Sequence, residues 1–189
     1  MMPKRASATG TWDFTPYELR NVLTFVRLDR PADANEVLSE LLRYRRPLPW
    51  QMFAEVVHSR LRYAGYFGDM PHTWIGTELV RAVIGMLMHE EDTTLVLLPA
   101  AAPAWLAGDG IRLSELRTAF GHLTLTARQE GARLHMTLGS GLAANTAVHV
   151  KWPSRQKPKS VLVDGRARAD QTADGIVLER PFQELVAQF

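Results

Sequence analysis

The segment between Pro49 and Ala82 contains the residues of this sequence that are best suited to chemistry. It places one carboxylate, Glu55, among apolar and aromatic neighbours, and a carboxyl group in such surroundings can serve as an acid or a base. Shortly afterwards a predicted loop gathers polar and aromatic side chains: Asp69, His72, Thr73 and Trp74. Groups of this kind can hydrogen-bond to the hydroxyls of a sugar, so the segment is a candidate site.

Each of these residues also has a purely structural interpretation. Glu55 could be an ordinary glutamate on a helix surface, because this residue type is rarely buried. His72 could belong to a helix-capping loop, and Trp74 could be a core tryptophan. Asp69 follows Gly68 and could simply be a turn residue. The residue types alone leave both interpretations open.

Other kinds of site have little support in the sequence. There is no Gly-rich phosphate loop, and no His-Glu-x-x-His or similar metal-ligand spacing occurs among the six histidines. No serine lies in a Gly-x-Ser-x-Gly elbow. The chain has no cysteine, which excludes disulfides and thiol chemistry. We therefore expect neither a metal nor a cofactor.

Charge and composition indicate an ordinary globular protein of 189 residues, 46% hydrophobic and 22% charged. The formal net charge is only +2. Basic residues gather at residues 43–46 and 155–159, next to prolines, and we expect them to be solvated surface rather than a nucleic-acid site. The N-terminus lacks the apolar core of a signal peptide. No apolar run is long enough to cross a membrane, so a cytoplasmic location is expected.

The first half of the chain has the apolar spacing of helices. The pattern predicts four of them, at about residues 16–26, 31–46, 51–61 and 74–89. Thr15–Glu18 has the form of a capping box with proline at the first helical position. The fourth helix is apolar around most of its circumference, which predicts burial on several sides.

The second half changes to an alternation of period two. Short strands are predicted at about residues 94–98, 123–128, 134–138, 148–152, 161–163 and 176–178. Turns are expected at Glu130-Gly131, and at Asp164-Gly165 and Asp174-Gly175, because Asp-Gly between apolar runs is a strong hairpin signal. The expected fold class is α+β: a helical region over residues 1–92, followed by an antiparallel β-sandwich over residues 93–189.

The segment Met70–Ala82 resembles the start of the last barrel helix in glucoamylase-like, six-hairpin glycoside hydrolases. In that family a Pro-x-Thr-Trp element leads into a helix with a Glu-Phe-Val-Arg-like run. Upstream, these enzymes have a Trp-x-x-x-x-Glu-like segment that ends in the catalytic general base, and Trp50 and Glu55 have the same spacing here. Tyr17–Asn21 resembles an earlier barrel helix, and residues 110–165 resemble the β-sandwich at the end of some bacterial members.

The resemblance implies that the helical region is part of an (α/α)6 barrel and that Glu55 is the general base. It also implies a set of substrate-binding residues: Trp50, Asp69, His72 and Trp74. Inverting glycosidases need two carboxyls about 6.5–9.5 Å apart, one to protonate the leaving oxygen and one to activate water. The family takes its general acid from the middle of the barrel, and that segment has no counterpart in this sequence. Glu55 could perform only the second task.

We therefore expect a C-terminal fragment or subunit of a bacterial glycoside hydrolase, inactive by itself. The expected partners are a carbohydrate and a protein that completes the barrel, with no nucleic acid and no membrane. One alternative is a non-catalytic module that binds carbohydrate or protein. Another is an independent helical-plus-β domain in which Glu55 is structural.

Overall fold

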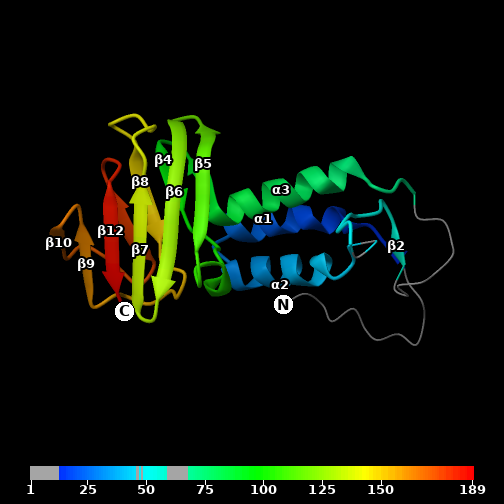
Figure 1. The fold of residues 1–189 in the computed structure, drawn as a ribbon, viewed down its shortest axis with the longest axis horizontal. Helices are drawn as coiled ribbons and strands as arrows, with labels where there is room; N and C mark the ends of the chain where they lie inside the picture. The colour runs from blue at the N-terminus through cyan, green and yellow to red at the C-terminus, as the bar shows by residue number, and fades with distance from the viewer. Residues whose placement is uncertain (1–12, 46, 48, 59–67) are drawn as a thin grey trace. The chain divides into compact units, whose positions relative to one another are not determined.

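A computed structural model describes residues 13–45, 47, 49–58 and 68–189 (Figure 1). The chain divides into two compact units, which we call the helical unit, up to Met86, and the β-unit, Leu87–Phe189. Helices belong to the first unit and two larger sheets to the second, so the α+β class is confirmed. The boundary expected between residues 92 and 93 lies inside a hairpin of the β-unit rather than between the units.

The helical unit consists of three α-helices, a 3-10 turn and two very short strands in its described part. In chain order these are β1 (Asp13–Phe14), η1 (Pro16–Leu19), α1 (Arg20–Arg27), α2 (Pro31–Leu42), β2 (Val57–His58) and α3 (Thr73–Leu87). Helix α2 begins at Pro31. Proline suits this position because backbone N–H groups in the first helical turn have no partner within the helix, so the N–H that proline lacks is not missed. Three of the four predicted helices therefore form.

Two local predictions in this unit are wrong. Thr15 makes no side-chain capping bond, because Pro16–Leu19 forms a 3-10 turn before α1 begins. Described residues 51–58 form no helix; instead, Val57 pairs with Phe14 between β2 and β1. A positive φ of 55° at Gln51 and the β-branched pair at residues 56–57 both disfavour a helix there. Residues 59–61 of that prediction lie outside the described residues.

Apolar stripes hold the helices together. Helix α1 buries Val22 and Val26, and α2 buries a longer stripe: Ala34, Val37, Leu38 and Leu41. Helices α1 and α3 approach closely, because a Cβ on Gly85 would lie 2.1 Å from Cδ2 of Leu23. Helix α3 buries Ile75 completely but leaves Val80 57% exposed. Among the described residues, the face of α3 that carries Val80 is therefore uncovered.

The β-unit contains ten strands and one short 3-10 turn. The strands are β3 (Met88–Glu91), β4 (Thr94–Leu97), β5 (Ile111–Thr118), β6 (Gly121–Glu130), β7 (Arg133–Leu138), β8 (Ala147–Lys151), β9 (Ser160–Val163), β10 (Arg166–Arg168), β11 (Gly175–Leu178) and β12 (Glu184–Gln188), with η2 at Pro103–Trp105. One sheet has the order β10-β9-β12-β7-β6-β5 and the other β11-β8-β4-β3. In Figure 1 the smaller sheet lies behind the larger one, as in a sandwich.

Strand pairing confirms two of the three expected turns. β6 and β7 pair around Gly131, and β9 and β10 pair around Asp164-Gly165. The hairpin at Asp174-Gly175 is wrong, because β11 pairs with β8 in the other sheet and not with β10. The expected purely antiparallel sandwich also needs correction, since β4 and β8 pair in parallel. Between β4 and β8 the chain forms three strands of the larger sheet, β5, β6 and β7, and then returns to the smaller sheet.

The core of the β-unit follows the alternation that the sequence predicts. Leu123, Leu125 and Ala127 of β6 are buried, and the residues between them are partly exposed. Trp152 is fully buried, and its indole N–H donates to the carbonyl oxygen of Thr172 at 3.0 Å. The indole therefore buries its apolar body and still satisfies its one polar group. None of the described helices combines the length and apolar character needed to span a membrane.

Candidate functional site

Two short segments of the helical unit run beside each other and bring the predicted site residues together. The backbone N–H of Glu55 donates to the carbonyl oxygen of Asp69 at 3.0 Å. The backbone N–H of His72 donates to the carbonyl oxygen of Phe53 at 2.9 Å. Phe53 is buried, so it anchors its segment in the core. These bonds set Glu55 opposite the loop that leads into α3.

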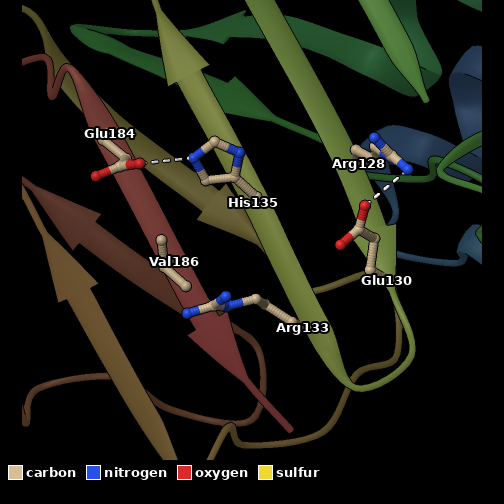
Figure 2. Close-up of a pocket in the computed structure, with 6 residues that line it drawn as sticks. All are labelled: Arg128, Glu130, Arg133, His135, Glu184 and Val186. Carbon is tan, nitrogen blue, oxygen red and sulfur yellow. Dashed lines mark hydrogen bonds and ion pairs between the residues drawn. The ribbon is translucent and has the colours of Figure 1, made fainter. Parts of the chain in front are cut away.

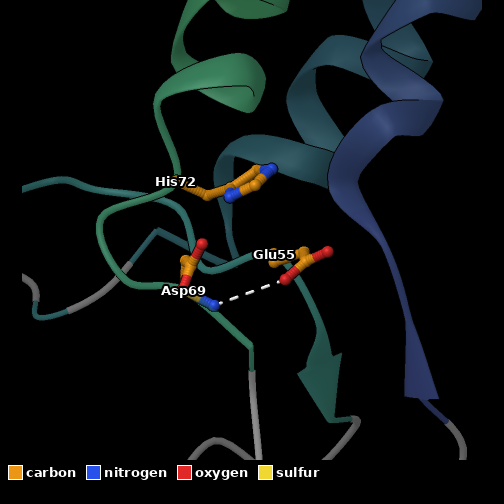
Figure 3. Close-up of side chains that lie close together, drawn as sticks. All are labelled: Glu55, Asp69 and His72. Atoms are coloured by element: carbon orange, nitrogen blue, oxygen red, sulfur yellow. Dashed lines mark hydrogen bonds between the residues drawn. The ribbon is translucent and has the colours of Figure 1, made fainter.

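The side chains of Glu55, Asp69 and His72 form the cluster shown in Figure 3. One carboxylate oxygen of Glu55, one of Asp69 and one ring nitrogen of His72 all lie within 4.8 Å of one another. The backbone N–H of Asp69 donates a long hydrogen bond of 3.4 Å to Oε2 of Glu55. Figure 3 shows the second carboxylate oxygen of Glu55 directed away from Asp69. Glu55 and His72 are half-buried and Asp69 is exposed, so the cluster opens to solvent on one side.

Gly68 makes room for the carboxylate of Glu55. A Cβ on Gly68 would lie 2.3 Å from Oε2 of Glu55, well inside van der Waals contact. Its φ of +67° lies in the left-handed region, which glycine adopts without the steric penalty that other residues incur. Both observations indicate that Gly68 is needed for the carboxylate to lie where it does.

Tyr17 orients the imidazole of His72. Its hydroxyl lies 2.7 Å from Nε2 of His72, and the two rings meet edge to face at 5.7 Å. The guanidinium of Arg20 lies over the Tyr17 ring, 4.6 Å from its centroid, and its Nε–H donates to Oε1 of Glu78 at 3.0 Å. Tyr17 of η1 therefore holds the ring of His72 and is itself contacted by Arg20 of α1. Nδ1 of His72 has no hydrogen-bond partner in the described part of the chain.

An exposed tryptophan lies next to the cluster. Trp74 is 68% exposed, and its ring centroid lies 6.5 Å from that of His72. Residues 69–74 line an open depression of about 390 Å³. This volume falls within the range of about 300–1,000 Å³ that is common for small-molecule sites. Trp50 is 67% exposed, but no ring contact among the described residues joins it to the cluster.

The two carboxylates of the cluster lie close to each other. Neither Glu55 nor Asp69 forms an ion pair with a lysine or arginine among the residues that the structure describes. Two negative charges about 4 Å apart repel each other by roughly 1 kcal/mol in water and about 4 kcal/mol at an effective dielectric constant near 20. The cluster is therefore suited to bind a cation.

The structure decides between some of the interpretations that the sequence leaves open. Glu55 is not on a helix surface, and Trp74 is not a core residue. Asp69 does lie in a bend, but its carboxylate also faces Glu55. Sequence reasoning missed the roles of Tyr17 and Gly68. Tyr17 lies 55 residues from its partner, and no local pattern predicts such a contact.

A second depression, of about 250 Å³, lies on the larger sheet of the β-unit. Figure 2 shows its residues on β6, β7 and β12: Arg128, Glu130, Arg133, His135, Glu184 and Val186. Arg128 pairs with Glu130 at 2.7 Å, and His135 pairs with Glu184 at the same distance. Because these charges neutralise one another, the β-unit surface is a weaker candidate than the cluster around Glu55.

Comparison with known proteins adds no family assignment: no protein-family model matches the chain, and no curated protein matches it.

Proposed function

We propose that the helical unit forms the general-base wall of a glycoside hydrolase active site and that Glu55 is the base. The observation that supports this most directly is the position of the Glu55 carboxylate. It is held by the Asp69 backbone beside an open depression that Trp74 lines. An exposed indole beside a carboxylate and an imidazole is a suitable surface for a sugar ring, which has both apolar faces and hydroxyl edges.

In the proposed reaction Glu55 takes a proton from a water molecule as the water oxygen forms a bond to the anomeric carbon. The bond from that carbon to the leaving group breaks, and the leaving oxygen needs a proton from a general acid. Oε2 of Glu55 is tied to the Asp69 N–H, so the other oxygen is the one that we assign to the water. The general acid has no counterpart in the sequence, so we propose that another polypeptide segment supplies it.

The exposed apolar residues of the helical unit agree with a partner of this kind. Val80 on α3 is 57% exposed, and Leu28, just after α1, is also exposed. Exposed apolar residues that form one continuous patch commonly mark a protein interaction site. We propose that barrel helices from such a segment cover them. We also propose a cytoplasmic location, with which the absence of cysteine from the sequence is compatible.

Glycosyl fluorides test the role of Glu55 without the missing acid, because fluoride leaves with little need for protonation. We expect no hydrolysis of ordinary glycosides by this chain, but base-dependent fluoride release from the glycosyl fluoride that fits the site. General base catalysis contributes about 100- to 10,000-fold, so Glu55→Gln is expected to lower the rate of fluoride release by at least about 100-fold. Equal fluoride release by both proteins would overturn the assignment.

The main alternative is a module that binds carbohydrate without reacting with it, and the exposure of Trp50 and Trp74 favours it. Stacking would then carry the affinity, so Trp74→Ala should abolish glycan binding while Glu55→Gln leaves it unchanged. Glycan arrays measure this binding, and fluoride release separates the two functions, because a module that only binds carbohydrate releases no fluoride even as the wild-type chain. The general-base proposal instead predicts that both variants lose fluoride release, and that glycan binding by Glu55→Gln persists.

A further inference from the structure

We propose that Glu55, Asp69 and His72 bind a first-row divalent cation of the Zn²⁺ or Mn²⁺ type. This site goes beyond the glycoside chemistry and does not depend on it. It also differs from the sequence-based expectation, which found no metal-ligand motif because the three ligands come from two segments with no standard spacing.

The donor atoms are close enough to share one ion. One atom from each of the three side chains lies within 4.8 Å of the others. Zinc–nitrogen and zinc–oxygen bonds of about 2.0–2.2 Å in a tetrahedral site place the ligand atoms of one ion about 3.3–3.6 Å apart. The cluster would therefore close on an ion through side-chain movements of up to about 1.5 Å.

The charge of the cluster supplies an independent argument for a cation. Glu55 and Asp69 face each other, and no lysine or arginine among the described residues pairs with either carboxylate. The same chain does neutralise carboxylates elsewhere, as at Asp174, which lies 2.6 Å from both Lys151 and Arg155. A bound cation would supply at the cluster the positive charge that the protein supplies at Asp174.

The imidazole of His72 is held as metal-binding histidines are held. Ligand histidines almost always hydrogen-bond through the ring nitrogen that does not bind the metal, which fixes the ring and its tautomer. Here the Tyr17 hydroxyl lies 2.7 Å from Nε2. When Nε2–H donates to the Tyr17 oxygen, the lone pair of Nδ1 is left for the ion.

The donor types select the class of cation. One imidazole nitrogen and two carboxylate oxygens, with no sulfur, suit Zn²⁺, Mn²⁺ or Fe²⁺, whereas Mg²⁺ and Ca²⁺ prefer oxygen ligands only. Three protein ligands leave at least one coordination position for water or another molecule. Because Glu55 is also the proposed base, bound Zn²⁺ should inhibit the fluoride release described above.

Titration calorimetry of the full chain, freed of metal with a chelator, tests the site with Zn²⁺ as the probe. We expect one site that Asp69→Asn and His72→Gln each weaken at least about tenfold, and that Tyr17→Phe weakens by about 10- to 100-fold, as for other supporting residues. The matched control is His135→Gln, which removes an exposed histidine paired with Glu184 in the β-unit and should leave this site unchanged. Circular dichroism verifies that each variant is folded.

The alternatives give different results. No Zn²⁺ binding by the wild-type chain would overturn the proposal, as would equal affinities of wild type, Asp69→Asn and His72→Gln, which would indicate adventitious binding at other histidines. Equal affinity for Mg²⁺ would contradict the class of cation. A failure to detect Zn²⁺ binding would not change the result expected in the fluoride assay. Loss of fluoride release in Glu55→Gln, but not in Asp69→Asn or His72→Gln, would support Glu55 as the general base and would not support the metal site.

Discussion

Asp174 in the β-unit and Glu55 in the helical unit are both partly exposed carboxylates, but their surroundings differ. Asp174 lies 2.6 Å from Lys151 and from Arg155. Glu55 faces a second carboxylate, and no described lysine or arginine lies within ion-pair distance of it. Among the described residues, the β-unit therefore pairs its carboxylate with two cations, whereas the helical unit sets two carboxylates against each other.

The helical unit also exposes more large apolar side chains than the β-unit does, among the described residues. In the described part of the helical unit they are Leu28, Trp50, Met70, Trp74 and Val80. In the β-unit the corresponding residues are only Leu162 and Val177 among those described. Contiguous exposed apolar surface commonly marks an interaction site. The greater exposure of apolar side chains in the helical unit is consistent with the binding role proposed above.

Asp174→Asn should give the largest loss of stability. The side chains of Lys151 and Arg155 are only 14% and 27% exposed, so removing the negative charge takes a close ionic partner from two largely buried cations. Asp174 itself is 43% exposed, and we discount the expected loss to about 1–2 kcal/mol for solvent screening. Urea unfolding of the β-unit, followed by fluorescence of the buried Trp152, measures it. Asp170→Asn, which removes an exposed pair with Arg168, is the control and should have little effect.

Gly68→Ala should separate the local function of the helical unit from its stability. Both Gly68 and Gly131 have positive φ, so alanine costs about 1 kcal/mol at either position. Only at Gly68 would the new Cβ meet Glu55, because nothing lies within 4 Å at Gly131. We expect Gly68→Ala to reduce Zn²⁺ affinity and fluoride release, and Gly131→Ala to change neither. Normal Zn²⁺ binding by Gly68→Ala would show that the position of the Glu55 carboxylate is unimportant.

The smallest expected effect concerns pH and Glu115 in the β-unit. Hydrogen bonds from the Thr124 hydroxyl and then from His122 lower the pKa of Glu115 below its usual 4.5. Because the folded-state pKa is the lower one, this carboxylate stabilises the fold above pH 4.5, and the contribution is lost as pH falls through the folded-state pKa. The urea midpoints of wild type and Glu115→Gln should therefore converge as pH falls from 7 to 3. A constant difference between them would contradict this.

Much of the fold could be predicted from apolar periodicity, but the site could be predicted only in part. Strands such as β6 and β7 alternate clearly, because one face of each is buried. Strand β3 was missed because its sequence, Met-His-Glu-Glu, is polar, and the parallel pairing of β4 with β8 depends on chain crossover rather than on local pattern. Near the site, residue types identified Glu55 and His72, whereas the contact of His72 with Tyr17 required the tertiary structure.

Glu55→Gln tests the central claim most directly, because it removes the charge of Glu55 and keeps its shape. The measurement is fluoride release from a glycosyl fluoride by wild type and variant, with the unfolding midpoint of each recorded on the same samples. Relief of charge repulsion with Asp69 predicts that Glu55→Gln is at least as stable as wild type, while its fluoride release falls by about 100-fold or more. A variant that is clearly less stable than wild type and still releases fluoride at the wild-type rate would contradict the account, because Glu55 would then be a structural residue.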